Sequence, residues 1–224
     1  MVAELNQIIY NDRQRETCYP FAQIYFNHSL TIFFENSVIV ELVKSSKADR
    51  IAVCSWKLKQ KLKWYIGRPR PITQELLESE YDIMSFTKNS KHHGMLYAAD
   101  KWHPGFRPTF DKILGAIGKK CPSEVKIPIY QNHHSSKREI YQDYVNTYLI
   151  PSMEVMQNDP EINKLVMVDS NYSKLNKTTE EVNRNLKEKL GIDYHPLAPF
   201  LLERLFSVYV HNLKLKVTHL DGNN

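Results

Sequence analysis

The chain has 224 residues, with 30 Lys and Arg against 25 Asp and Glu, so its formal net charge is +5. A chain of this length can bury roughly 70% of its unfolded surface and needs no disulfide or metal to fold. Hydrophobic residues make up 42% and charged residues 25%, which is typical of globular proteins and excludes collagen-like, Gly-rich and wholly disordered classes. We expect one domain over residues 1–224, with residues 1–20 and 214–224 at its periphery.

The first elements follow from apolar spacing. Apolar residues recur at helical intervals over 31–43, and the short apolar run 51–55 predicts a buried strand. Pro71 suits the first turn of a helix that runs toward residue 78. A second short strand is expected over 81–86.

Proline, glycine and capping signals bound the later elements. The expected elements are a helix over 104–118, an extended segment over 127–130, a helix that starts at the capping box Ser136–Glu139 and ends or kinks at Pro151, a helix over 178–191, a last helix from Pro199 and a short strand over 215–218. The alternation of strands and helices predicts an α/β fold, with a small, mostly parallel or mixed sheet flanked by helices.

The positions of the cysteines and of the apolar residues indicate which classes of protein are not expected. Cys18, Cys54 and Cys121 form no CxxC pair, so neither a disulfide framework nor a zinc knuckle is predicted. The N-terminus lacks a basic stretch followed by a long apolar core, and no run approaches the roughly 20 apolar residues of a membrane span. We therefore expect a cytoplasmic protein with no membrane span.

The most basic part of the chain is the run 57–70, whose six Lys and Arg residues are interleaved with Trp56, Trp64 and Tyr65. Such a segment can hold phosphate or nucleic acid through charge and stacking. It can equally be a solvated amphipathic helix whose Trp residues contact the core. Because the overall charge is mild for a nucleic-acid-binding domain, nucleic acid is not the expected partner.

Several familiar catalytic motifs are absent. The sequence has no GxGxxG, GxxxxGK[ST], GxSxG or HExxH pattern, which excludes the usual nicotinamide, P-loop, serine-hydrolase and zinc-protease signatures. It also lacks the Asp-x-Asp with which hard carboxylates chelate a divalent ion beside a diphosphate. The nearest pattern, Glu78-Ser-Glu80-Tyr-Asp82, suits a solvated helix end as well as an acidic site. No residue is assigned to a metal.

Three polar clusters interrupt apolar segments, at Glu35, at 130–136 and at Glu203-Arg204. Each can be a helix surface with its caps, or part of a site. The middle cluster is the strongest candidate, because it joins an expected strand to an expected helix whose free amides can bind an anion. It includes a His-His pair at 133–134, and histidine can exchange protons near neutral pH.

The order of segments resembles that of uncharacterised glycosyltransferase-like families of bacterial polysaccharide-synthesis loci, whose fold is GT-A-like. The segments that carry the resemblance are KADRIAVCSWK at 47–57, YDIM at 81–84, the stretch 132–151 and FLLERLFSVYV at 200–210. They follow in order over most of residues 22–217. Three features depart from the pattern: no opening strand is recognisable before Tyr10, Ser55-Trp56-Lys57-Leu58 replaces a basic-aromatic cluster, and the carboxylate pair is missing.

The resemblance implies an enzyme that moves a sugar from a nucleotide sugar to a glycan or lipid-linked acceptor, with Mn²⁺ or Mg²⁺ as a candidate cofactor. Its base would be one of Glu35, Asp82, His133 and Glu203. Its substrate-binding residues would be Trp56, Lys57, Arg68, Arg70, Trp102, Asn132, Ser135 and Ser136. The alternatives are an inactive descendant of the fold that binds a glycan or protein, and an accessory protein of nucleic acids that uses the run 57–70.

Overall fold

A six-stranded mixed sheet forms the centre of the protein, in the order β2-β1-β3-β5-β4-β6. The computed structural model describes residues 2–27, 31–66, 72–78, 80–86, 94–125, 129, 132–172 and 180–220. Among the described strands, β5 alone runs antiparallel to its neighbours. The strands are β1 (Ala3–Ile9), β2 (Gln23–Phe26), β3 (Arg50–Ser55), β4 (Ile83–Ser85), β5 (His134–Lys137) and β6 (Val217–His219). The expected α/β fold with a mixed sheet is confirmed.

The first strand differs from the expectation for the N-terminus. β1 lies inside the sheet, parallel to both β2 and β3, so this part of the chain is not peripheral. Two buried polar residues, Asn6 and Gln7, break its apolar pattern and hide it in the sequence. Asn6 Nδ2 donates to the Ala52 carbonyl at 3.2 Å, and Gln7 Oε1 accepts from the Tyr19 amide at 2.6 Å. Because these groups are hydrogen-bonded, the strand tolerates their burial.

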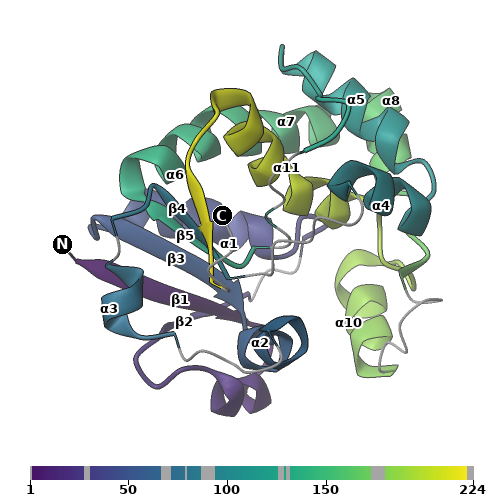
Figure 1. Ribbon diagram of the computed structural model, residues 1–224. Helices are drawn as coiled ribbons and strands as arrows, with labels where there is room; N and C mark the ends of the chain where they lie inside the picture. Colours follow the sequence, from purple (N-terminus) through teal and green to yellow (C-terminus); the bar gives the residue numbers. More distant parts are fainter. Residues whose placement is uncertain are drawn as a thin grey trace.

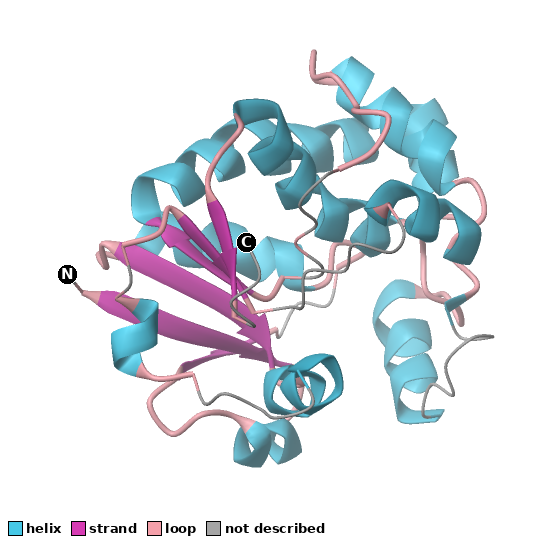
Figure 2. Cartoon of the chain, in the orientation of Figure 1, coloured by secondary structure: helices cyan, strands magenta, loops and turns pink. Residues whose placement is uncertain are grey.

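Helices cover both faces of the sheet (Figures 1 and 2). Successive side chains of β3 point to opposite faces. Ile51 and Val53 join the larger apolar core, whereas Ala52 and Cys54 join the smaller one. The larger core includes residues of α1 (Glu35–Ser45), α6 (Arg138–Tyr144) and α11 (Ala198–Leu213), and the smaller one residues of α2 (Leu58–Ile66) and α3 (Gln74–Leu77).

A group of helices extends the larger core away from the sheet (Figure 1). Within it α5 packs against α4, α7 and α8. The remaining elements are the 3-10 helix η1 (Asp12–Thr17), α4 (Met95–Trp102), α5 (Phe106–Ala116), the π-helix η2 (Val145–Leu149), α7 (Ile150–Asn158), α8 (Pro160–Val166) and α10 (Glu180–Leu190). None of the helices in the described ranges is long and apolar enough to cross a bilayer.

The predicted capping box at residues 136–139 is wrong, and at Pro151 the structure decides between the two expected outcomes. Ser136 does not cap a helix, because it lies within β5, and the N-cap of α6 is Lys137 with no side-chain hydrogen bond. Pro151 does not end the helical segment. It falls in the first turn of α7, where proline is tolerated, and the chain stays helical from Arg138 through the π-helix to Asn158.

Candidate functional site

A polar site lies at the edge of the sheet where β1 and β3 end. The chain leaves β1 toward β2 on one side and returns as β3 on the other, so the two strands flank a topological switch point. Ligands of open α/β sheets bind at such points, beyond the carboxyl ends of the strands. Because β5 is antiparallel, its amino end meets the same edge. The switch-point site consists of Tyr10, Glu35, Lys57, Lys61, Asn132, His133 and Glu203.

Glu35, the first residue of α1, is the central carboxyl group of this site. Burial, and after it the charge of Glu203, raise its pKa to about 7. The charge of Lys61 and the side-chain amide of Asn132 act in the opposite direction. A carboxyl group with a pKa of about 7 can take up and release a proton at neutral pH, as a general base must.

Two lysines of one helical turn supply positive charge. Lys57 and Lys61 are four residues apart at the start of α2, and both lower the pKa of Glu35. Burial lowers the pKa of Lys61, while the charges of Glu203 and Glu35 counteract it. The lysines therefore offset the charge of the two carboxylates and can also face an anionic ligand.

Glu203 lies on α11 beside its sequence neighbour Arg204. Glu203 Oε2 is 2.8 Å from Arg204 Nη1, and the same nitrogen donates to the Phe200 carbonyl at 3.1 Å. The ion pair is partly buried, with side-chain exposures of 24% and 16%. These contacts fix the position of the Glu203 carboxylate on α11, at the site.

His133 is 1% exposed, and neither ring nitrogen has a hydrogen-bond partner among the described residues. Burial, and then the charge of Lys61, lower its pKa well below 6.5, so the ring is neutral. A buried polar side chain without a partner next to a polar site points to a water or ligand there. His134 points elsewhere: its ring stacks on Phe206 at 3.9 Å and belongs to the core.

The structure brings five of the residues predicted from the sequence to this edge: Glu35, Lys57, Asn132, His133 and Glu203. Trp56 adjoins them, with its ring centroid 5.1 Å from Lys57 Nζ. Arg68 and Arg70 lie outside the described residues.

Four other predicted residues lie elsewhere. Asp82 is at the amino end of β4, on the opposite edge of the sheet, where its carboxylate is 2.7 Å from Lys137 Nζ. Ser135 and Ser136 are buried within β5 and paired with both neighbouring strands, so they offer no helix N-terminus. Trp102 ends α4 and is 53% exposed.

Sequence reasoning did not single out Tyr10 and Lys61 as site residues. Burial and the charge of Glu35 raise the pKa of the Tyr10 hydroxyl, which places this group beside the carboxyl. Lys61 carries one usable signal, its spacing of four residues from Lys57, which puts both side chains on one face of a helix. Tyr10 directly follows β1. Because that strand was not recognised from the sequence, Tyr10 could not be placed at a strand end.

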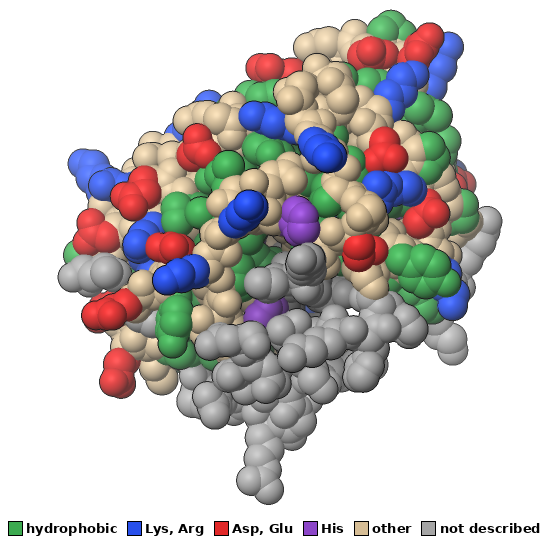
Figure 3. Space-filling model, turned by 45° about the horizontal axis from the view of Figure 1, so that its top comes forward, with side chains coloured by type: hydrophobic (Ala, Val, Ile, Leu, Met, Phe, Trp, Pro, Cys, Tyr) green, Lys and Arg blue, Asp and Glu red, His purple; other side chains and the backbone are tan. Residues whose placement is uncertain are grey.

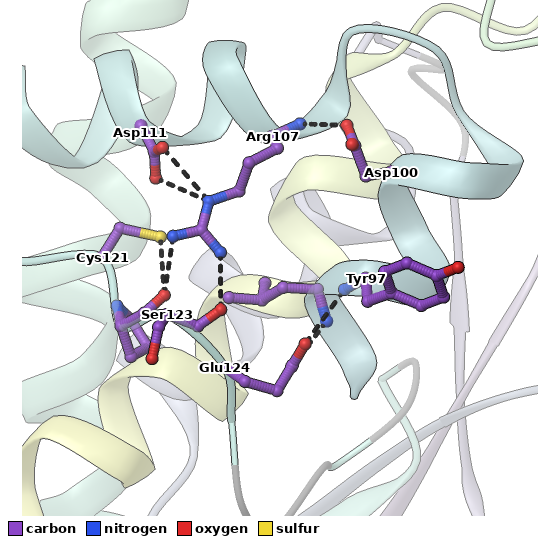
Figure 4. A network of polar contacts seen from close by, with 9 residues as sticks. Tyr97, Asp100, Arg107, Asp111, Cys121, Ser123 and Glu124 are labelled. Atoms are coloured by element: carbon purple, nitrogen blue, oxygen red, sulfur yellow. Dashed lines mark hydrogen bonds and ion pairs between the residues drawn. The ribbon is translucent and has the colours of Figure 1, made fainter. Parts of the chain in front are cut away.

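Other charged groups of the described residues show no comparable site. Acidic and basic side chains are interspersed on the face in Figure 3. A polar network joins α4 to α5 through Arg107, whose donors are used within the protein (Figure 4). No group of three or more His, Cys, Asp and Glu in the described ranges could hold a metal ion.

Comparisons of the chain with family models, with curated proteins and with solved structures found no match in any of the three. The fold and the site define an α/β protein with a mixed sheet and a site of carboxyl groups and lysines at its switch point.

Proposed function

We propose that this protein is a glycosyltransferase-like enzyme that transfers a sugar from a nucleotide-sugar donor to a glycan or lipid-linked acceptor. The observation that carries the proposal is the position of Glu35, a carboxyl group with a pKa of about 7, beside two lysines at the switch point. Glycosyl transfer needs both kinds of group: a base for the acceptor hydroxyl, and positive charge for the diphosphate that leaves.

The segments that resemble glycosyltransferase-like families support the proposal, because three of them supply site residues. The segment 47–57 ends at Lys57, the segment 132–151 begins with Asn132 and His133, and the segment 200–210 contains Glu203. The strand β1 ends before Tyr10, where those families have their opening strand. The mostly parallel sheet is compatible with a GT-A-like arrangement.

In the proposed reaction the acceptor oxygen bonds to the anomeric carbon of the donor sugar. The bond between that carbon and the phosphate oxygen breaks, and the nucleoside diphosphate leaves with the electron pair. The acceptor's proton passes to the Glu35 carboxylate. Lys57 and Lys61 stabilise the charge on the leaving diphosphate, and neutral His133 can hydrogen-bond a phosphate or sugar oxygen.

The test is a thermal-shift screen against UDP-, GDP- and ADP-sugars, each with and without Mn²⁺ or Mg²⁺. A ligand that binds the native state raises its apparent stability. We expect one donor class to do so, and release of free nucleotide on prolonged incubation. Glu35→Gln should reduce release about 10²- to 10⁴-fold, the usual contribution of a general base.

Glu41→Gln is the matched control, because Glu41 lies on the same helix and is exposed. It should leave nucleotide release unchanged. If no nucleotide sugar stabilises the protein at millimolar concentration, the donor-binding proposal is wrong.

The second candidate is a non-catalytic descendant of the fold that binds a glycan or protein. The missing Asp-x-Asp favours it. Donor binding without any release of nucleotide, equal in the wild type and Glu35→Gln, would support this candidate instead.

A further inference from the structure

A continuous row of rings borders the switch-point site. We call it the ring row, and it consists of Phe34, His195, Tyr172, Phe200 and His103. Consecutive ring centroids are 5.7 Å apart for Phe34 and His195, 5.0 Å for His195 and Tyr172, 5.1 Å for Tyr172 and Phe200, and 4.2 Å for Phe200 and His103. These distances lie in or close to the range of direct ring contacts.

The ring row lies beside the proposed base. Phe34 directly precedes Glu35, and Phe200 is one helical turn before Glu203 on α11. The charge of Lys57 lowers the pKa of both His195 and Glu35, so both groups lie near this lysine. A ligand that packs on Phe34 is therefore bound next to the residue that carries the proposed base.

Phe34 has a strained backbone. Its φ is 52° and its ψ −123°, a conformation that a bulky residue rarely adopts. Such strain persists only where the surrounding structure holds it, and it clusters at binding and catalytic sites. Phe34 places its own ring against that of His195, and it is also the residue at which α1, the helix that carries Glu35, begins.

His195 supplies a polar atom within the row. The residue is 6% exposed, and its Nε2 has no hydrogen-bond partner among the described residues. Burial lowers its pKa to about 4, so the ring is neutral and can donate or accept one hydrogen bond. Its neighbours in the row, Phe34 and Tyr172, are only half-buried and offer their rings to a ligand.

From these features we propose that the ring row is the acceptor subsite and that it takes a neutral sugar. The apolar face of the sugar packs on Phe34 and Tyr172, and one of its hydroxyls hydrogen-bonds to His195 Nε2. This inference rests on the proposed function, because it makes the adjacent Glu35 the group that deprotonates the acceptor. The side chains of the ring row carry no charge, so they cannot replace the water around a charged ligand. They suit a neutral sugar, which has apolar faces and hydroxyl groups.

The binding test uses saturation-transfer NMR with the methyl glycosides of glucose, galactose, mannose and N-acetylglucosamine. We expect signals from at least one glycoside. Tyr172→Ala and Phe34→Leu should each weaken its binding about 3- to 10-fold, the effect of one lost ring contact. His195→Phe keeps a ring of similar size and should weaken binding by loss of the Nε2 hydrogen bond alone.

Matched controls come from aromatic residues outside the row. Tyr97 is 64% exposed on α4, and Phe21 is 45% exposed before β2. Tyr97→Ala and Phe21→Leu should leave the NMR signals unchanged, and thermal unfolding of every variant shows whether it is folded. The proposal is overturned if no glycoside gives a signal, or if folded row variants bind it as well as the controls do.

The outcome separates the two proposals. Nucleotide-sugar binding with no glycoside bound at the row would leave the proposed function intact and remove the acceptor subsite. Glycoside binding at the row with no nucleotide sugar bound would keep the subsite as a glycan-binding site and remove the proposed transfer.

Discussion

Glu203 and Glu35 repel each other across the switch-point site. After burial, the charge of Glu203 is the largest cause that raises the pKa of Glu35 to about 7. The two residues belong to α11 and α1, which pack against each other in the larger core. The protonation of the proposed base is therefore set by the contact between two helices, as well as by its own burial.

The first prediction concerns the pH dependence of nucleotide release. Release should rise with pH to a plateau, with a midpoint near the Glu35 pKa of about 7. Glu203→Gln removes a negative charge, lowers the pKa of Glu35 and moves the midpoint to lower pH. Lys61→Met removes a positive charge and moves it to higher pH. At pH 6 the Glu203→Gln variant should be about 2- to 5-fold faster relative to its own plateau.

These opposite shifts follow only if Glu35 is the titrating base. If the pH midpoint of nucleotide release is the same in the wild type and in both variants, the titrating group is not Glu35. Glu41→Gln, on the exposed side of α1, should reproduce the wild-type profile.

The second prediction concerns stability. The pKa of Glu35 is about 7 in the folded protein and near 4.5 in the unfolded chain, so the folded state binds this proton more tightly. Glu35 thus favours folding below pH 4.5, and this stability is lost as the pH rises through 7. Glu35→Gln should be more stable than the wild type by about 1–3 kcal/mol at pH 8, and equal to it near pH 4.5.

Urea unfolding at the two pH values measures the difference. A variant that loses both stability and nucleotide release at pH 8 would show that Glu35 has a structural role instead. The expected result, greater stability with less activity, is typical of a buried functional charge.

The sequence predicted elements whose apolar pattern is regular, such as β3 and α5. It missed β1 because Asn6 and Gln7 interrupt that pattern, although both are hydrogen-bonded in the sheet. Site residues such as Glu35 were predictable as polar interruptions of apolar helices. Asp82 was misplaced because the sequence does not say which edge of the sheet a strand end will reach.

The remaining differences arise from contacts between distant segments. Ser135 and Ser136 fit a capping motif, but the pairing of β5 with β3 and β4 holds them in a strand. The ring row draws its members from segments spread along the chain between Phe34 and Phe200, so no local spacing could reveal it.

The third prediction tests whether His134 belongs to the core. Its ring lies 3.9 Å from that of Phe206 and 5.2 Å from that of Tyr141, and burial lowers its pKa to about 3. Neither ring nitrogen has a hydrogen-bond partner among the described residues. His134→Phe fills the same space without the unpaired nitrogens and should be neutral or stabilising. His134→Ala leaves a cavity and should cost about 2–4 kcal/mol.

Both variants can be compared with the wild type by urea unfolding. Equal losses of stability for the Phe and Ala variants would mean that the imidazole nitrogens of His134 are needed in the core.

The fourth prediction concerns Arg107, which joins α5 to the segment after it (Figure 4). Its Nε donates to Asp111 at 3.1 Å, and its Nη1 and Nη2 donate to the carbonyls of Ser123 and Pro122 at 3.0 and 2.8 Å. A lysine carries the same charge but cannot make this fork of contacts. Arg107→Lys should therefore destabilise the protein by about 1–2 kcal/mol.

Arg15→Lys is the matched control for Arg107→Lys. Arg15 pairs with Asp12 at 3.5 Å, and their side chains are 54% and 84% exposed, so the geometry of the guanidinium has little effect there. Its unfolding midpoint in urea should equal that of the wild type. If Arg107→Lys also unfolds at the wild-type midpoint, the charge of Arg107 alone explains its contribution to stability. The hydrogen bonds to the two carbonyls then do not stabilise the segment after α5.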